Sequence, residues 1–227
     1  MKIRITFAKQ GALRYTGHLD LHKIWERTAR RAGLSLTYSQ GFHPQPKMQL
    51  AAALPLGFSS RCELLDMRLE GQVDLVTLPE RLQGAAPPGL KILQVEEIDE
   101  ASPPLQTQVI SAEYEVTLPD EVEAGELTRI LDSVFAAESL PRERRGKAYD
   151  LRPLIEVLTL RPSVLPFSQT GGLELPETRE NGGKKRDVLF MRLAAREGAT
   201  GRPEEVLAAL GVDYEGARVE RTRFIFK

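Results

Sequence analysis

The sequence predicts an α+β protein built from two tandem ferredoxin-like (βαββαβ) units. Three observations lead to this class. Residues 2–9 alternate polar and apolar side chains, as a half-buried strand does, and residues 18–32 carry apolar side chains at steps of three and four, as an amphipathic helix does. The elements that follow complete the order strand, helix, two strands, helix, strand, and this order recurs after a stretch that contains two adjacent prolines.

The opening strand and helix have the clearest patterns. Ile3, Ile5 and Phe7 share one side of the strand, and its other side is basic. The helix over 18–32 is expected to end before Gly33, because a glycine at this place can adopt the left-handed conformation that closes a helix. These two elements should therefore pack against each other through their apolar sides.

Shorter patterns predict the rest of the first unit. Extended segments are expected at 34–38, 47–53, 62–69 and 90–98. Before the last of them, Thr77 and Glu80 have the spacing of a capping box, in which each side chain accepts a hydrogen bond from the other residue's backbone. A short helix is expected to begin there.

The chain is expected to divide into two domains. The first covers residues 1–99, a linker covers 100–108, and the second covers 109–227. Within the second domain, residues 162–187 are rich in Gly, Pro and charge and are expected to form a flexible loop.

The second domain repeats the elements of the first without repeating its sequence. Strands are expected near 110–118, 151–160, 188–195 and 218–226, and a helix near 125–137. A second helix should begin at Arg202, because Pro203 suits its first position and the acidic Glu204 and Glu205 suit its positively polarised end.

Charge is divided along the chain, although the formal net charge is −1. Residues 1–50 contain nine Lys or Arg and two Asp or Glu, whereas residues 51–140 contain five and seventeen. A basic surface that meets an anionic partner would give this division. Pairing of opposite charges across the fold would give it as well. A further basic run at 141–147 could extend such a surface.

Composition excludes several classes of protein. No run of apolar residues is long enough to span a membrane, and the N-terminus alternates instead of forming a signal-peptide core, so a cytoplasmic protein without membrane contact is expected. The single cysteine, Cys62, excludes an internal disulfide, and this chain alone cannot supply a thiolate zinc site or an iron–sulfur cluster. No cofactor is predicted.

The helix over 18–32 has a basic side. At 100° per residue, Lys23, Arg27 and Arg30 lie opposite Leu21, which is at the centre of the apolar stripe. The simplest interpretation is a solvent-exposed cationic face that contacts phosphates.

His18 and His22 lie four residues apart on the flank of the same helix, a spacing at which two imidazoles can share a metal ion. The zinc-hydrolase motif is absent, because Leu19 and not glutamate follows His18. No metal site is predicted, and His18 and His22 remain weak candidates for one. Capping and packing by His18 is the alternative.

The segment 38–47, YSQGFHPQPK, is the most unusual local sequence of the chain. Its two prolines fix extended backbone, and Gly41 permits a tight turn, so that Phe42, His43 and Lys47 are presented on a stiff support. Aromatic, imidazole and cationic groups together suit binding of a base or a phosphate. The alternative is a structural crossover in which Phe42 fills the core.

Six motifs occur together in this chain: GHLD at 17–20, RRAGL at 30–34, YSQGFHP at 38–44, LPLG at 54–57, DLRPL at 150–154 and Arg221-Thr222. The combination spans nearly the whole chain and resembles the bacterial radical SAM-linked protein family, a domain of unknown function. Members of that family are encoded beside a radical SAM protein or fused to one, often near ribonuclease and ribosomal-protein genes. The resemblance implies a radical SAM partner and a role around RNA or ribosomes.

Two positions depart from the family pattern. Gly17 stands where the family usually has serine, and Gln45 stands where it often has histidine. The resemblance therefore implies neither a hydroxyl group before His18 nor a two-histidine metal clip in the loop.

The leading hypothesis is an accessory protein of a radical SAM enzyme that binds RNA or presents an RNA- or ribosome-related substrate. A radical SAM cluster needs three cysteines, so this chain would act as the partner and not as the enzyme. The residues expected to contact nucleic acid are Lys23, Arg27, Arg30, Phe42, His43 and Lys47.

Two alternatives remain. The first is a metal-independent endoribonuclease or small hydrolase in which His18 or His43 transfers a proton. The second is a protein–protein adaptor whose acidic segment 51–140 docks a basic partner.

Overall fold

The fold was analysed in a computed structural model, which describes residues 1–119, 124–144, 146–162, 187–214 and 216–227. The strands are β1 (Lys2–Lys9), β2 (Met48–Leu50), β3 (Ser59–Arg68), β4 (Leu90–Ile98), β5 (Val109–Thr117), β6 (Pro141–Arg144), β7 (Lys147–Asp150), β8 (Ile155–Pro162), β9 (Asp187–Arg196), β10 (Ala199–Thr200) and β11 (Arg218–Phe226). The α-helices are α1 (His18–Arg31), α2 (Leu78–Ala85), α3 (Leu105–Gln108), α4 (Ala124–Ala136) and α5 (Pro203–Ala209).

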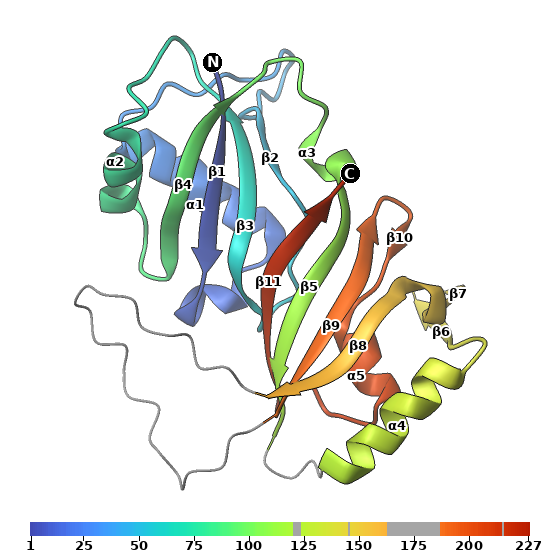
Figure 1. Cartoon of the computed structure of the whole chain (residues 1–227). Coiled ribbons are helices and arrows are strands. Elements are labelled where there is room, and N and C mark those ends of the chain that lie inside the picture. Colours follow the sequence, from blue (N-terminus) through green and yellow to red (C-terminus); the bar gives the residue numbers. More distant parts are fainter. Residues whose placement is uncertain (120–123, 145, 163–186, 215) are drawn as a thin grey trace, which may run out of the picture.

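The architecture is mixed α+β, as predicted. Nine strands form one mostly antiparallel sheet in the order β10-β9-β5-β11-β3-β1-β4, with β2 added to β3 and β8 added to β9. β6 and β7 form a separate hairpin (Figure 1). None of the helices in the described part of the chain is long and apolar enough to cross a membrane.

The two halves of the large sheet meet through β11 and β3. The strands of residues 1–98 have the order β4-β1-β3-β2, and those of residues 109–226 have the order β11-β5-β9-β8, with every pairing inside each half antiparallel. β11 joins β3 in parallel, with Glu220 opposite Ser59 and Arg221 opposite Ser60. One continuous sheet therefore carries both halves.

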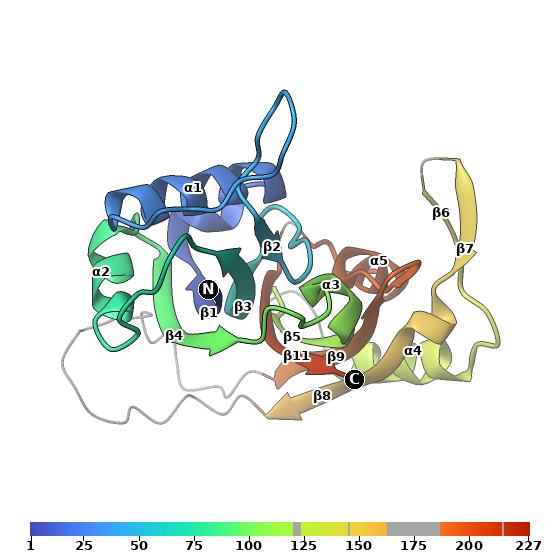
Figure 2. The same ribbon diagram turned by 90° about the horizontal axis from the view of Figure 1, so that it is seen from above.

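β1 and α1 form the centre of the first half, as their patterns predict. Ile3, Ile5 and Phe7 are completely buried, and the ring of Phe7 meets that of Trp25 edge-on at 4.8 Å. Such an edge-to-face pair adds to the burial of two large side chains. Gly33 has φ +70°, the left-handed conformation expected for the end of the helix. α1 thereby covers one face of the strands (Figure 2).

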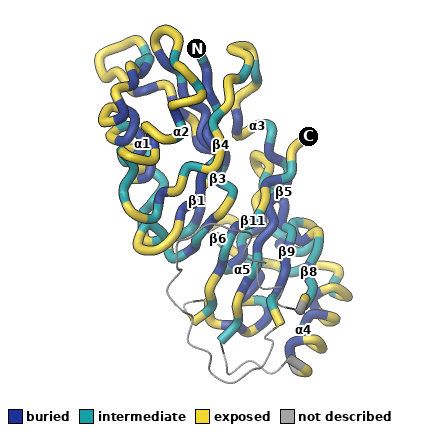
Figure 3. Tube along the Cα trace, turned by 60° about the vertical axis from the view of Figure 1, so that its left-hand side comes forward, coloured by how far each residue is buried: buried dark blue, intermediate teal, exposed yellow. Residues whose placement is uncertain are grey.

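The buried residues form two cores, and the second contains residues from both halves of the chain. The first core lies between β1, β3, α1 and α2. The second lies under α4 and α5 and also includes Ala51, Leu54, Phe58 and Leu64 from the first half. Buried residues run along the strands of both halves in Figure 3. The segment before β3 is therefore shared by both halves.

The predicted capping box is wrong, although the helix α2 begins where it was expected. Thr77 has helical backbone angles and makes no side-chain capping bond. Its hydroxyl group instead donates to a carboxylate oxygen of Asp74 at 2.9 Å. Asp74 also accepts from the backbone N–H of Val76, so it organises a turn before the helix.

Three further segments differ from the sequence analysis. The predicted linker ends in the helical turn α3, whose Leu105 is buried. The basic run 141–147 contributes to the β6–β7 hairpin, for which no strand was predicted. β8 begins at Ile155, four residues later than expected. Most of the predicted flexible loop, residues 163–186, lies outside the described residues.

Candidate nucleic-acid interface

The outer side of α1 carries the predicted cations, and two of them have acidic neighbours. Lys23, Arg27 and Arg30 are exposed. The Lys23 ammonium lies 3.5 Å from the Asp20 carboxylate, and the Arg30 guanidinium lies 2.8 Å from that of Glu26. Such exposed pairs contribute about 1 kcal/mol or less. A phosphate can therefore replace the carboxylate at little cost.

Arg27 is exposed and makes no hydrogen bond or ion pair with any of the described residues. Arg31, one position beyond Arg30, is exposed and equally without such a partner in the described part of the chain. Sequence analysis did not single out Arg31. Its place 100° from Arg30 puts it on the flank of the helix, toward α2.

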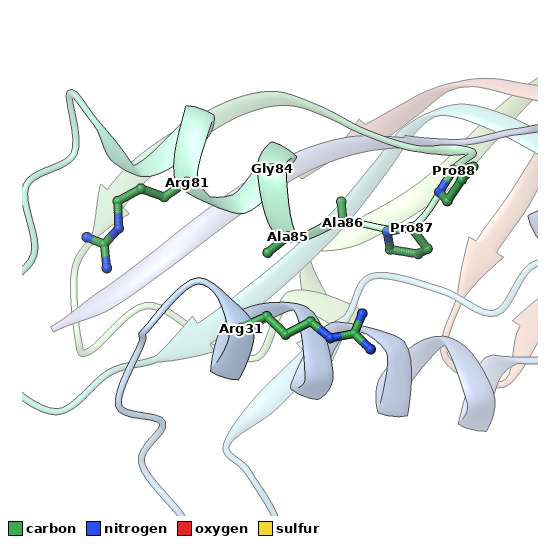
Figure 4. Close-up of a pocket in the computed structure, with 7 residues that line it drawn as sticks. All are labelled: Arg31, Arg81, Gly84, Ala85, Ala86, Pro87 and Pro88. Atoms are coloured by element: carbon green, nitrogen blue, oxygen red, sulfur yellow. The ribbon is translucent and has the colours of Figure 1, made fainter.

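A groove of about 540 Å³ separates α1 from α2. Arg31, Arg81 and residues 84–88 line it, and the two arginines extend in opposite directions along it (Figure 4). Arg81 donates to the backbone carbonyl of Ala32 at 2.7 Å and so closes the end of α1. Of these two arginines, Arg81 is engaged by the backbone, whereas the Arg31 guanidinium has no partner among the described residues. Arg31 therefore adds one cation to the cationic face of α1.

The segment after the helix forms a closed hairpin. Tyr38 and Pro46 pair across its base, Ser39 N–H donates to the Gln45 carbonyl at 2.8 Å, and Gln45 N–H donates to the Ser39 hydroxyl at 2.9 Å. In Figure 2 this segment rises beyond α1, away from the sheet. We call residues 38–46 the tip hairpin.

The tip hairpin presents its aromatic and imidazole groups to solvent. Phe42 is completely exposed (102%), and His43 is exposed as well. The interpretation in which Phe42 fills the core is therefore wrong. The base of the hairpin is tied to α1, because Arg30 donates to the Tyr38 hydroxyl at 2.7 Å. The tip hairpin, which carries Phe42 and His43, therefore projects from the side of the sheet on which α1 lies.

Of the two helix histidines, His22 is held by the backbone of β2. Nε2 of His22 lies 3.1 Å from the carbonyl oxygen of Met48, so Nε2 carries the proton and donates it. The ring centroids of His18 and His22 are 6.5 Å apart with planes tilted by 56°. Burial, followed by the neighbouring His22, lowers the pKa of His18. The described residues contain no group of three or more potential metal-ligating side chains.

His43 has no hydrogen-bond partner among the residues that the structure describes. His18 likewise has none there apart from its ring contact with His22. A general base usually has a second group that orients it, and neither histidine has one in this arrangement.

Part of the basic excess of the first 50 residues lies inside the protein. Lys9 is 1% exposed and donates to the Thr16 carbonyl at 2.8 Å. Arg4 holds the buried Asp66 with two hydrogen bonds of 2.7 and 3.0 Å. β1 therefore uses its cations internally, whereas α1 leaves some of its cations in solvent, and a contact of those cations with an anionic partner stays a prediction.

A buried ion pair joins the two halves beneath α1. Arg221 donates to Glu63 at 2.9 Å, to the Ala53 carbonyl at 2.7 Å and to the Tyr114 hydroxyl at 3.3 Å. Arg221 and Glu63 are 2% and 1% exposed. Each of the three guanidinium nitrogens donates at least one hydrogen bond, so this cluster holds the fold together.

The DLRPL motif also has a structural role. The Asp150 carboxylate accepts from the N–H groups of Leu140 and Arg152, and these bonds lower its pKa. The Arg152 guanidinium donates to the Phe135 carbonyl at 3.1 Å and thereby closes the end of α4. These residues fix the connection between β7 and β8 and hold it against the end of α4.

Comparison with known proteins gives a family match and a number of distant structural likenesses. The model of a family described as "Uncharacterized protein conserved in bacteria (DUF2344)" matches residues 2–199. No curated protein matches the chain.

Among these likenesses is a chain of a Cbf5-Nop10-Gar1 complex, with 14% identity, a TM-score of 0.45, and coverage of 98% of this chain and 48% of that chain. An unknown protein from Galdieria sulphuraria has 13% identity and a TM-score of 0.26, and the match covers 99% of this chain and 98% of that chain. A putative glycine cleavage system transcriptional repressor has 12% identity and a TM-score of 0.24, with coverage of 100% of this chain and 98% of that chain. The chain spans less than half of the first of these chains (48%). At such identities and TM-scores they assign no function.

Proposed function

The chain belongs to the DUF2344 family of proteins conserved in bacteria, and from this premise we propose that it is an accessory protein that binds RNA through α1 and the tip hairpin. In this proposal it is a cytoplasmic protein, and the chemistry takes place on a radical SAM partner. Its role is to hold RNA, or a ribosome-related substrate, for that partner.

One observation carries the proposal. Phe42 is completely exposed on a closed hairpin whose base is tied to α1 through Tyr38 and Arg30. The same helix carries the exposed Arg27 and Arg31, and neither of them is paired with any described residue. Exposed aromatic rings beside free guanidinium groups suit single-stranded nucleic acid, because a base stacks on the ring while the cations take its phosphates. Stacking of this kind is worth about 1–3 kcal/mol per base.

The remaining cations of the face support the same function. Lys47 follows the tip hairpin, and its side chain has no partner among the described residues. Lys23 and Arg30 can exchange a carboxylate for a phosphate, because an exposed ion pair is weak. Arginine holds a phosphate with two parallel hydrogen bonds, which gives Arg27 and Arg31 the larger share of binding.

The assignment of radical chemistry to a partner is supported by the state of the only cysteine. Burial is the main factor that raises the pKa of the Cys62 thiol, to about 12. A thiol in that state is protonated at neutral pH and is a poor iron ligand or nucleophile. The resemblance to radical SAM-linked proteins indicates which class of partner would supply the missing cluster.

We also infer that the halves are tandem ferredoxin-like units, over 1–99 and 109–227, separated by the linker 100–108. The strand orders β4-β1-β3-β2 and β11-β5-β9-β8 support this inference, because both have the order that a split βαβ unit requires. α1 and the tip hairpin then belong to the first unit alone.

The test is binding of a fluorescent single-stranded RNA, followed by anisotropy across a salt series. We expect an affinity that falls steeply as salt rises, with a logarithmic slope of about −0.7 for each phosphate contacted. An absent affinity, or one that salt does not change, would overturn the proposal. The endoribonuclease and adaptor alternatives remain predictions, and the same samples, examined for RNA cleavage, test the first of them.

A further inference from the structure

A cavity of about 300 Å³ lies at the base of the tip hairpin, bounded by β1, β2, β3 and the linker. Its volume is at the lower end of the range for small-molecule sites, about 300–1,000 Å³. Its lining includes three cationic side chains and one carboxylate, together with uncharged polar groups: Lys2, Lys47, Arg68, Asp66, Ser39, Gln45, Gln49 and Ser102.

Lys2 is the unusual residue of this cavity. Its side chain is only 7% exposed, and its ammonium group donates one hydrogen bond, to the Ser102 carbonyl at 3.1 Å. The nearest carboxylate, that of Asp66, is 3.9 Å away. A lysine ammonium has three donors, so a buried ammonium group with one hydrogen bond still needs an anion or another acceptor.

Asp66 fills that need only in part, because its single negative charge is shared with Arg4. Arg4 donates to both of its carboxylate oxygens, at 2.7 and 3.0 Å. Asp66 carries one negative charge against the two positive charges of Arg4 and Lys2, so these three side chains together leave one net positive charge beside the cavity. A second comes from Lys47, whose side chain is exposed and has no partner among the described residues.

The rim has the groups that would orient an anion and the atoms attached to it. Arg68 is held by Glu100 at 2.6 Å, so it borders the cavity as a fixed group. Gln45 and Gln49 supply amide groups, which can both donate and accept. Pro46 and Pro104 line the cavity with apolar surface. Two cations, amides and apolar rings fit a phosphate that carries a small organic group.

We propose that this cavity binds the phosphate monoester of a nucleotide, with Lys2 and Lys47 as its cationic contacts. The inference deepens the proposed RNA binding and rests on it for the choice of a nucleotide. Lys47 follows the tip hairpin directly, and Ser39 and Gln45 of that hairpin line the cavity. The same phosphate chemistry is found at the end of an RNA strand and in a free mononucleotide.

Isothermal titration of the full chain with adenosine 5′-monophosphate tests the site, with adenosine as the uncharged control. We expect the monophosphate to bind at least tenfold more tightly than adenosine. Lys2→Met keeps the apolar stem and removes the charge, and should weaken binding by at least tenfold. Lys47→Gln should weaken it about threefold or more. Lys91→Met on β4 is the matched control, since Lys91 is exposed and outside the cavity.

Lys2→Met changes a buried residue and can disturb the fold, whereas Lys47→Gln changes an exposed residue. The Lys47 variant therefore tests the site independently of any misfolding of the Lys2 variant. Thermal unfolding of each variant shows whether the fold is retained. Monophosphate binding no tighter than that of adenosine, or unchanged by both Lys2→Met and Lys47→Gln, overturns the site.

Two 10-nucleotide RNAs, with and without a 5′-phosphate, identify the source of the ligand. If the phosphorylated strand binds more tightly, and Lys47→Gln removes this difference, the ligand is the end of an RNA strand. If both strands bind equally while the monophosphate still binds, the ligand is a free nucleotide. Monophosphate binding without any RNA binding would leave the cavity site standing and overturn the RNA-binding proposal. RNA binding without monophosphate binding would overturn the cavity site and leave the RNA-binding proposal standing.

Discussion

Arg221 and Glu63 lie 2.9 Å apart in the interior of the sheet, although 158 residues separate them in the sequence. Glu63 stands in β3 of the first half, and Arg221 stands in β11, the strand that joins the second half to it. The Tyr114 hydroxyl and the Ala53 carbonyl complete the contacts of the guanidinium. The two halves are therefore connected by a charged pair as well as by backbone pairing.

Replacement of one member of this pair should cost more than replacement of both. Arg221→Met leaves the Glu63 carboxylate buried without its partner, and we expect the free energy of unfolding to fall by about 3–5 kcal/mol. The double variant Arg221→Met with Glu63→Leu should recover much of that loss, because no buried charge remains. Urea unfolding followed by circular dichroism measures both. A single variant within about 1 kcal/mol of the parent would contradict this role.

Removal of two cations from α1 should reduce the dependence of RNA binding on salt. Arg27→Gln with Arg31→Gln eliminates two phosphate contacts, so we expect the logarithmic salt slope to become less steep by about 1.4, from about 0.7 per contact. Anisotropy titrations at several salt concentrations measure the slope. Arg129→Gln is the matched control, because Arg129 is an exposed arginine on α4, which is far from α1 (Figures 1 and 2). Equal salt slopes for the parent and for the Arg27→Gln, Arg31→Gln double variant would show that the RNA binds elsewhere.

Loss of the aromatic ring of the tip hairpin should weaken RNA binding without weakening the fold. Phe42→Ala removes one stacking surface, which we expect to lower the affinity by about 5- to 150-fold, or about 1–3 kcal/mol. Phe42→Trp should keep or improve the affinity, since a larger ring still stacks. Because Phe42 is completely exposed, the melting temperature of both variants should equal that of the parent. An alanine variant with parental affinity would exclude stacking on this ring.

The lowered pKa of His18 predicts that the protein loses stability as it is acidified. A histidine whose pKa is lower in the folded state than its ordinary value of 6.5 binds protons more readily when unfolded, so protonation favours unfolding. The unfolding free energy should therefore decrease between about pH 7.5 and about pH 5.5, above the range in which most carboxylates titrate. His18→Gln should flatten this dependence, and His43→Gln, at an exposed site, should leave it unchanged. Urea midpoints across this range decide the matter, and identical curves for His18→Gln and the parent would contradict it.

The elements that could be predicted are those whose pattern is local. β1 and α1 follow from the positions of residues such as Ile5 and Trp25, because one apolar side suffices to define each element. The mixed α+β class follows from the order of such elements. The start of α2 was found for an incorrect reason: Thr77 bonds to Asp74 and not to the helix, a competition that residue spacing does not resolve.

The parts that could not be predicted depend on residues far apart in the chain. The β6–β7 hairpin has charged side chains on both strands, and an alternation of apolar and polar residues is therefore missing from it. Lys2 belongs to the predicted basic side of the first strand, but it is buried, and its ammonium group donates to the carbonyl of Ser102, 100 residues later. The sequence identified Arg221 only as part of a motif and could not predict its buried ion pair, because its partner Glu63 lies in the other half of the chain.

The parallel pairing of β11 with β3 has a consequence for the synthesis of the protein. After Glu63 has been made, the ribosome has to add 158 residues before Arg221 exists. During that time β3 lacks the neighbour that pairs with Ser59 and Ser60, and its buried carboxylate has no guanidinium partner. An unpaired strand edge is a site at which nascent chains associate incorrectly. The sheet is therefore completed long after β3 has been synthesised, and the first half reaches its final form only when β11 arrives.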